Sequence, residues 1–281
     1  MPAPLNPAVE PASQDPAHSK VRDLKVRAIS GLILAPLGLG VVYLGGTVFF
    51  AVVAIFALGL GLEWMFLTET AYGAALIVPF GLLMSVVAAQ FSTPHHTLIA
   101  LLASAVIATS ITRRISTLGG VLYLGWALIS ILYLRASPHG AFALIALLLV
   151  VWSADVGAYL GGRFIGGPKL APTISPGKTW SGAFTGLLAG VIAGVLCAWM
   201  GGYSTSQPAL MAATILSLAI VIASQLGDLL ESAVKRRYGK KDSSQLIPGH
   251  GGLLDRLDAV LGAAFCLGIA TVIHSGAFPW R

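Results

Sequence analysis

Long apolar runs alternate with short polar connections along most of this chain. Each run is close to about 20 residues and lacks strand-like alternation, and only helices or closed barrels satisfy every backbone group in hydrocarbon. The pattern therefore predicts an all-α fold, a polytopic helical membrane protein with about nine transmembrane helices. The predicted spans cover residues 27–46, 47–67, 71–91, 96–111, 115–134, 141–162, 180–201, 209–231 and 258–276.

The polar segments divide the chain into three parts. Residues 1–26 contain five prolines and no apolar run, which predicts a disordered cytosolic tail. Residues 27–140 form the N-terminal transmembrane helices, and residues 141–281 form a C-terminal transmembrane region with two cytoplasmic loops, 163–180 and 232–258. The fourth span is short, so a re-entrant segment is the alternative there.

The basic residues predict the orientation, because cationic loops stay on the cytoplasmic side. With nine spans and a cytoplasmic N-terminus, 15 of the 17 lysines and arginines lie inside, and only Arg135 and Arg281 lie outside. The net charge of +6 and the 56% hydrophobic composition exclude an ordinary soluble domain. They predict anionic lipid headgroups or phosphorylated substrates as partners, and no nucleic acid.

Acidic residues inside apolar spans are costly and often mark function. Glu63 stands alone beside Trp64, so a structural role is favoured for it. Asp155, Tyr159 and Arg163 recur every four residues and share one helix face. This second pattern predicts either an internal ion pair or a substrate contact.

The most polar stretch follows the eighth span. Asp228, Glu231 and Lys235 fall on one helix face, and "IPGHGGLLDRLD" occupies residues 247–258. Glycines let backbone N–H groups approach a phosphate, and lysines and arginines supply positive charge. Carboxylates among such bases are explained if a divalent metal binds as well, since hard cations take oxygen ligands. The loop therefore predicts a site for metal and phosphate.

The other polar loop reads "GGRFIGGPKLAPTISPGKTWSG". Its "GKT" suggests a phosphate-binding P-loop, but Pro172 stands where that pattern needs glycine, and we expect no preceding strand. Lys178 and Thr179 are still placed to hold a phosphate at the N-terminus of the seventh span. In that span, glycines recur at every fourth position, at residues 182, 186, 190 and 194. This stripe predicts close packing within the chain, with a homodimer interface as the alternative.

The run "SAVKRRYGKKDSSQLIPGHGGLLDRLD", residues 232–258, resembles the signature of the phosphatidate cytidylyltransferases, or CDP-diacylglycerol synthases. The matching positions are Ser232, Lys235, Arg236, Lys241, Asp242, Ser244, Pro248, His250, Gly251, Gly252, Asp255, Arg256 and Asp258. "DVGAYLGGRFIG" and "ISPGKTWSG" are similar to two further segments of the family. Ser181 departs from the pattern, because family members commonly carry an acidic residue there.

The resemblance implies transfer of the cytidylyl group of CTP to phosphatidic acid in the membrane lipid, giving CDP-diacylglycerol and pyrophosphate for phospholipid synthesis. It implies a Mg²⁺ requirement, with or without a monovalent cation, and a catalytic region in residues 141–281. The expected location is a bacterial inner membrane, with the active site at the cytoplasmic face.

The resemblance also assigns roles to residues of this chain. Asp228 and Asp255 are the expected metal carboxylates, and they form the catalytic set with Lys235 and His250, an acid–base or loop-fixing group. The expected substrate-binding residues are Asp155, Arg163, Ser175, Lys178, Thr179, Arg236, Lys241, Gly251, Gly252, Arg256 and Asp258.

Two other functions are alternatives. An ion-coupled transporter would use Asp155 and Asp228 as ion sites, but it needs polar residues that continue toward the outer face, and the sequence lacks them. A related lipid kinase, such as a polyprenol kinase, would share the site chemistry but form no CDP-lipid.

Overall fold

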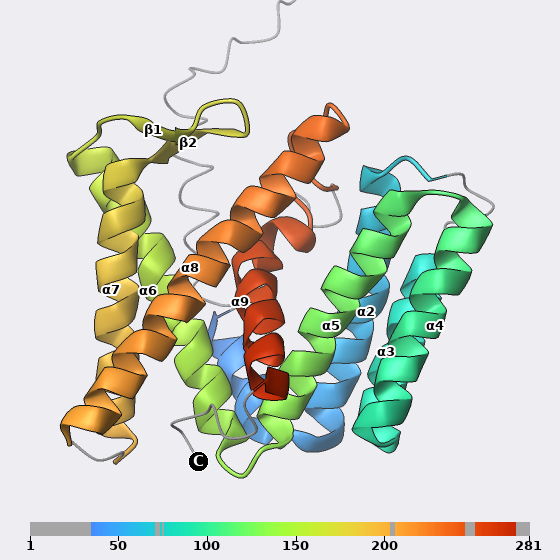
Figure 1. The fold of residues 1–281 in the computed structure, drawn as a ribbon, viewed down its shortest axis with the longest axis horizontal. Helices are drawn as coiled ribbons and strands as arrows, with labels where there is room; N and C mark the ends of the chain where they lie inside the picture. Colours follow the sequence, from blue (N-terminus) through green and yellow to red (C-terminus); the bar gives the residue numbers. More distant parts are fainter. Residues whose placement is uncertain (1–34, 71–73, 75, 203–205, 245–250, 274–281) are drawn as a thin grey trace, which may run out of the picture. The chain divides into compact units, whose positions relative to one another are not determined.

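The computed structural model describes residues 35–70, 74, 76–202, 206–244 and 251–273 (Figure 1). The chain divides into two units, Met1–Gly38 and Leu39–Arg281, and the second contains every labelled element. Its elements are α2 (Gly46–Leu67), α3 (Ile77–Phe91), α4 (Pro94–Thr112), α5 (Ile115–Ala136), α6 (Gly140–Phe164), β1 (Lys169–Ala171), β2 (Ser175–Thr179), α7 (Trp180–Met200), α8 (Gln207–Arg237) and α9 (Leu254–Ile273). The predicted tail, residues 1–26, lies outside the described residues.

Six helices in the described part are long and apolar enough to cross a membrane: α2, α4, α5, α6, α7 and α8. The chain is therefore a helical integral membrane protein. Helix α4 is one of the six with 19 residues, so the fourth predicted span needs no re-entrant segment. Helix α3 has 15 residues and is shorter than the predicted span 71–91, and another short apolar helix covers Ala35–Leu44.

The predicted boundaries of the loop 232–258 are wrong at both ends. Helix α8 continues to Arg237, and α9 already begins at Leu254. The extension of α8 is stabilised by the Glu231–Lys235 ion pair (2.5 Å) and by three cations in its last turn, which favour the negative end of the helix dipole. The connection between the two helices therefore covers residues 238–253.

A two-stranded hairpin joins α6 to α7, and the expectation that no strand precedes α7 is wrong. Strands β1 and β2 pair antiparallel, with Lys169 opposite Thr179 and Ala171 opposite Ser175. The Ile174 N–H closes the turn by donating to the Ala171 carbonyl oxygen (3.2 Å). At the other end, the Thr179 hydroxyl accepts from the Gly182 N–H (3.1 Å) and caps α7. The hairpin thus fixes where Lys178 lies.

Glycines bring the helices of the C-terminal half close together. A Cβ atom on Gly186 of α7 would lie 2.7 Å from the Ala154 carbonyl oxygen of α6. A Cβ atom on Gly194 would overlap the Ser217 side chain of α8. The stripe predicted in the seventh span is therefore used for packing within the chain. Helix α8 runs obliquely between α7 and α9 (Figure 1), and Gly227 and Gly262 allow its close approach to α9.

The carboxylate of Glu63 in α2 holds the start of α9. Glu63 is only 1% exposed, and it accepts hydrogen bonds from the backbone N–H groups of Leu253 (2.7 Å) and Leu254 (2.6 Å). The Ser244 hydroxyl donates to the same carboxylate (2.6 Å), and Ser243 donates at 3.4 Å. Because a buried carboxylate is costly unless it is hydrogen-bonded, these contacts account for its position. Among the described residues, Glu63 thus has structural contacts with backbone N–H groups and serine hydroxyls, and no ion pair with a base.

Replacing Glu63 by Gln should destabilise the protein. The variant keeps the volume of the side chain but turns an amide N–H₂ toward donors that need an acceptor, and loss of charged hydrogen bonds costs about 1.5–3 kcal/mol. Thermal unfolding in detergent should show a lower midpoint. The matched control is Glu69→Gln, because the Glu69 side chain is 63% exposed and its one ion pair among the described residues is a 3.9 Å contact with Lys240. Equal midpoints for both variants would contradict the structural role of Glu63.

Replacing Gly186 by Ala should also lower stability, by about 1–3 kcal/mol, because the added methyl group meets the backbone of α6. Gly119→Ala in α5 is the control, since a Cβ atom there has no heavy atom within 4 Å. The free energy of unfolding of both variants is compared by chemical denaturation in the same detergent. If Gly186→Ala is as stable as Gly119→Ala, α6 and α7 do not pack as described.

Candidate active site

A cavity of about 560 Å³ opens between the hairpin and the adjoining ends of α6, α7 and α8. Three separate segments that the sequence analysis singled out line it: the end of α6, strand β2 and the polar turn of α8. Its polar lining residues are Asp155, Tyr159, Arg163, Lys178, Thr179, Gln225 and Asp228. Five of these are predicted site residues, so the structure brings the first polar loop together with Asp155 of α6 and Asp228 of α8. No described residue of the second polar loop, 232–258, lines this cavity.

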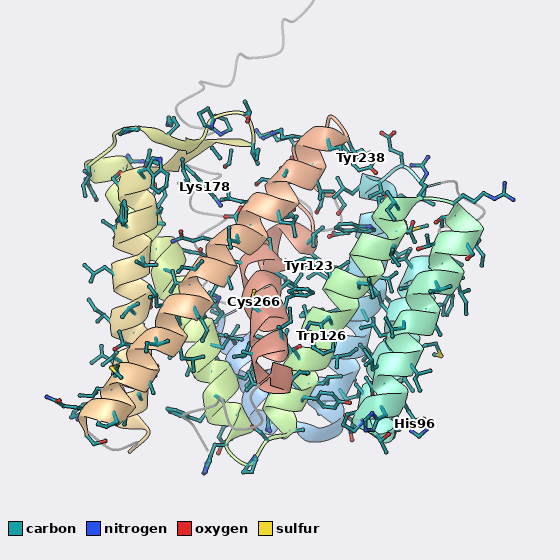
Figure 2. The ribbon with its side chains drawn as sticks, viewed as in Figure 1. His96, Tyr123, Trp126, Lys178, Tyr238 and Cys266 are labelled. Carbon is teal, nitrogen blue, oxygen red and sulfur yellow. The ribbon has the colours of Figure 1, made fainter. Side chains whose placement is uncertain are left out.

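Two residues that line this cavity, one in β2 and one in α8, form an ion pair. The Lys178 Nζ lies 2.5 Å from the Asp228 Oδ2, and both side chains are about one-third exposed, at 27% and 31%. Figure 2 shows Lys178 between the hairpin and α8. The Ser232 hydroxyl donates to the other oxygen of Asp228 at 3.5 Å. A lysine ammonium next to a partly exposed carboxylate provides one group for an anionic ligand and one for a cation.

Three carboxylates are close enough to interact electrostatically around Lys178. Asp155 of α6, Asp228 of α8 and Asp258 of α9 interact pairwise, and Asp155 and Asp258 each also interact with Lys178. Lys178 forms an ion pair with one of them, Asp228. The carboxylate oxygens at this position are the kind of ligand that Mg²⁺ prefers.

The described residues contain no group of three or more Asp, Glu, His or Cys side chains that could enclose a metal ion. Mg²⁺ usually keeps several waters and is held by one or two carboxylates together with substrate phosphates. The donor set here fits that mode of binding and not a closed protein cage. A metal in this cavity would therefore bind together with a phosphorylated ligand.

The predicted face of α6 is confirmed. Asp155, Tyr159 and Arg163 all line the cavity, and the Arg163 Nη1 donates to the Tyr159 hydroxyl (3.2 Å). Asp155 forms no ion pair with another residue that the structure describes. Of the two roles predicted for this face, the position favours contact with a ligand.

Asp255 and Lys235 belong to a neighbouring cluster. The Lys235 Nζ lies 2.5 Å from Glu231 and 2.6 Å from the Asp255 Oδ1. Asp255 also accepts from the N–H groups of Gly252 (2.9 Å) and Ser243 (3.0 Å) and from the Ser243 hydroxyl (3.0 Å). Burial alone would raise the pKa of Asp255, but hydrogen bonds from Glu231, Lys235 and these backbone groups outweigh it and hold the pKa below its usual range. Neither Asp255 nor Lys235 lines the cavity.

The other predicted residues have different positions. The Arg236 guanidinium donates to the carbonyl oxygens of Ile174 (3.2 Å) and Lys240 (3.1 Å), so it ties the hairpin turn to the end of α8. Ser175 begins β2, Gly251 has a positive φ of 80° next to Asp255, and Arg256 is exposed in the first turn of α9. Lys241 is exposed in the connection after α8, and His250 lies outside the described residues.

Gln225 and the role of Ser181 were not predicted from the sequence. Gln225 lines the cavity and donates to the Ala183 carbonyl oxygen of α7 (3.1 Å). Its position three residues before Asp228, on the same helix face, was the available signal. The Ser181 hydroxyl donates to the Gly166 carbonyl oxygen and lies 3.0 Å from the Thr179 hydroxyl. Ser181 thus closes the base of the hairpin in place of the acidic residue expected there.

Comparison with known proteins identifies the family. Residues 25–274 match the model of the cytidylyltransferase family. The chain is 36% identical over 257 residues to a phosphatidate cytidylyltransferase of Brucella suis biovar 1 (strain 1330), covering 87% of this chain and 92% of the relative. It is 36% identical over 263 residues to the phosphatidate cytidylyltransferase of Pseudomonas aeruginosa, covering 85% and 94%. The Haemophilus influenzae protein of the same name is 48% identical over 132 residues, or 47% of this chain and 46% of the relative. The chain belongs to the cytidylyltransferase family.

Proposed function

We propose that this chain transfers the cytidylyl group of CTP to phosphatidic acid and releases CDP-diacylglycerol and pyrophosphate. The observation that carries the proposal is the cavity in which Lys178 and Arg163 lie beside Asp155 and Asp228, at the ends of membrane-spanning helices. A soluble triphosphate and a membrane-bound phosphate have to meet at such an end. The names of the relatives and the family of the chain support the same reaction.

In the proposed reaction, a phosphate oxygen of phosphatidic acid forms a bond to the α-phosphorus of CTP. The bond from this phosphorus to the β-phosphate oxygen breaks, and pyrophosphate leaves with the electron pair. Such a step needs positioning and neutralisation of charge more than a protein nucleophile. Lys178 and Arg163 are placed to bind phosphate oxygens, and Gln225 and Tyr159 are placed to hydrogen-bond the nucleotide.

We propose that Asp228 and Asp255 hold Mg²⁺, which neutralises charge on the phosphates when bound. In this structure each of these carboxylates is paired with a lysine ammonium at 2.5–2.6 Å, Lys178 for Asp228 and Lys235 for Asp255. A cation therefore already balances each carboxylate. Lys178, which lines the cavity, is placed to turn to phosphate oxygens once a metal takes its position, whereas Lys235 keeps Glu231 as a partner. A monovalent cation beside Mg²⁺ stays part of the proposal.

The location is proposed on the same grounds. The proposed location is the inner membrane of a bacterial cell, with the cavity open to the cytoplasm, where CTP is found. The basic residues support this orientation, because with nine spans and a cytoplasmic N-terminus most of them lie on the cytoplasmic side. The partners are CTP, phosphatidic acid and membrane lipid, without nucleic acid. A homodimer is compatible with the exposed apolar face of α7 that includes Phe184, Leu188 and Ile192.

The proposal is tested with purified protein in lipid, given Mg²⁺, phosphatidic acid and CTP labelled with ³²P at either the α- or the γ-phosphate. Label from the α-position should enter lipid, and label from the γ-position should appear in pyrophosphate. A lipid kinase that used CTP would instead transfer the γ-phosphate, so label from the γ-position would enter lipid and label from the α-position would not. Asp228→Asn should lower the rate by about 100-fold or more, because it removes charge from the reacting site, whereas Glu69→Gln should retain it. A folded wild-type protein that labels no lipid from α-labelled CTP would refute the proposal.

A further inference from the structure

A second cavity, of about 550 Å³, lies on the other side of α8. It is lined by residues of α2, α5 and α8, including Leu230, Val234 and Arg237. At 3.6 residues per turn, these three residues lie on the face of α8 opposite Gln225 and Asp228, which line the first cavity. The two cavities are therefore separated by the helix itself.

The rim of this cavity is basic. Arg114 at the start of α5 and Arg237 at the end of α8 both line it, together with Tyr238. Arg114 donates to the Thr68 carbonyl oxygen (2.5 Å) through Nη1, which leaves its positive charge and its remaining N–H groups available. Arg237 is exposed and makes no ion pair with another residue in the described part of the chain. Two arginines at one rim, neither of them in an ion pair with a described carboxylate, attract an anion.

The wall of the cavity is apolar and continues to the surface of the bundle. Ile115 and Leu230 line the cavity and are 75% and 47% exposed, so they face lipid in a membrane-spanning protein. Deeper in the cavity, the buried Tyr123 hydroxyl has no hydrogen-bond partner among the described residues. Figure 2 shows Tyr238 near the end of α8 and Tyr123 further along the bundle. The cavity thus presents arginines at the membrane boundary, a hydroxyl below them and an apolar wall open to lipid.

We propose that this cavity binds an anionic membrane phospholipid as a site separate from the one that carries out transfer. The phosphate would lie at Arg114 and Arg237, and an acyl chain would lie along Ile115, Leu230 and Val234. A zwitterionic lipid leaves the two arginines unbalanced, and a water-soluble anion leaves the apolar wall uncovered. The lipid would also cover apolar surface between α8 and the adjoining parts of α2 and α5, which together line the cavity. The inference does not rest on the proposed function, since it concerns another cavity.

The test uses two variants that change different parts of the cavity. Arg237→Gln removes charge from the rim. Gly119→Leu fills the cavity, because Gly119 lines it and a Cβ atom at this position has no heavy atom within 4 Å. Arg113→Gln is the control, since Arg113 is an exposed neighbour of Arg114 that does not line the cavity.

Binding is measured without CTP, by native mass spectrometry of the full-length protein titrated with phosphatidylglycerol or phosphatidylcholine. Wild type and Arg113→Gln should bind the first phosphatidylglycerol more tightly than phosphatidylcholine. Arg237→Gln should weaken that binding about fivefold, and Gly119→Leu should weaken it with no fall in the thermal midpoint. Equal binding by all four proteins, or equal binding of the two lipids by wild type, would overturn the proposal. Because CTP is absent, either result leaves cytidylyl transfer to be judged separately.

Discussion

A buried carboxylate from the N-terminal half of the chain holds the helix that completes the candidate site. Glu63 of α2 accepts from the backbone N–H groups at the start of α9, and Asp255 in the first turn of α9 accepts from Ser243, Gly252 and Lys235. In a membrane, each backbone N–H or C=O group that lacks a hydrogen-bond partner costs several kcal/mol. The two carboxylates therefore fix where α9 begins, and with it where Asp258 faces Asp228.

Charge balance is the second constraint on this end of the molecule. Two lysines that the sequence placed in the site are matched with carboxylates, Lys178 with Asp228 and Lys235 with both Glu231 and Asp255. The pairs permit polar residues to lie in a protein that is otherwise mostly apolar. The same groups are suited to exchange partners when phosphate and metal arrive together, since ammonium and carboxylate each retain their charge.

Much of the fold was predictable from the sequence, because the bilayer requires helices of a certain length and apolar runs mark them. The face formed by Asp155, Tyr159 and Arg163 was predictable for a similar reason, since helical periodicity alone places them together. The hairpin was not, because a strand such as "SPGKT" has no apolar alternation and is defined by cross-strand bonds. The partners of Glu63 could not be predicted either, as they are backbone groups about 190 residues away along the chain.

The sequence placed Asp228 at the end of a helix and Asp255 in the loop that follows it, whereas the structure places Asp255 in the first turn of α9. The two residues stand on separate helices, and each has its own lysine, so their chemistry depends on how α8 crosses α9 at Gly227 and Gly262. The second cavity could not be predicted from the sequence either, because its residues come from separate helices. Its basic rim combines Arg114 with Arg237, which no local pattern connects.

We propose that CTP binds in the cavity between the hairpin and α8. The most direct measurement introduces Leu170→Cys, at a half-buried position of β1 that lines this cavity, in a chain whose Cys197 and Cys266 are replaced by Ala. The rate of reaction with a charged, water-soluble maleimide is measured with and without CTP and Mg²⁺. CTP should slow labelling at position 170 but not at Arg113→Cys, an exposed position that does not line the cavity. Labelling of position 170 at the same rate with and without saturating CTP would contradict the account.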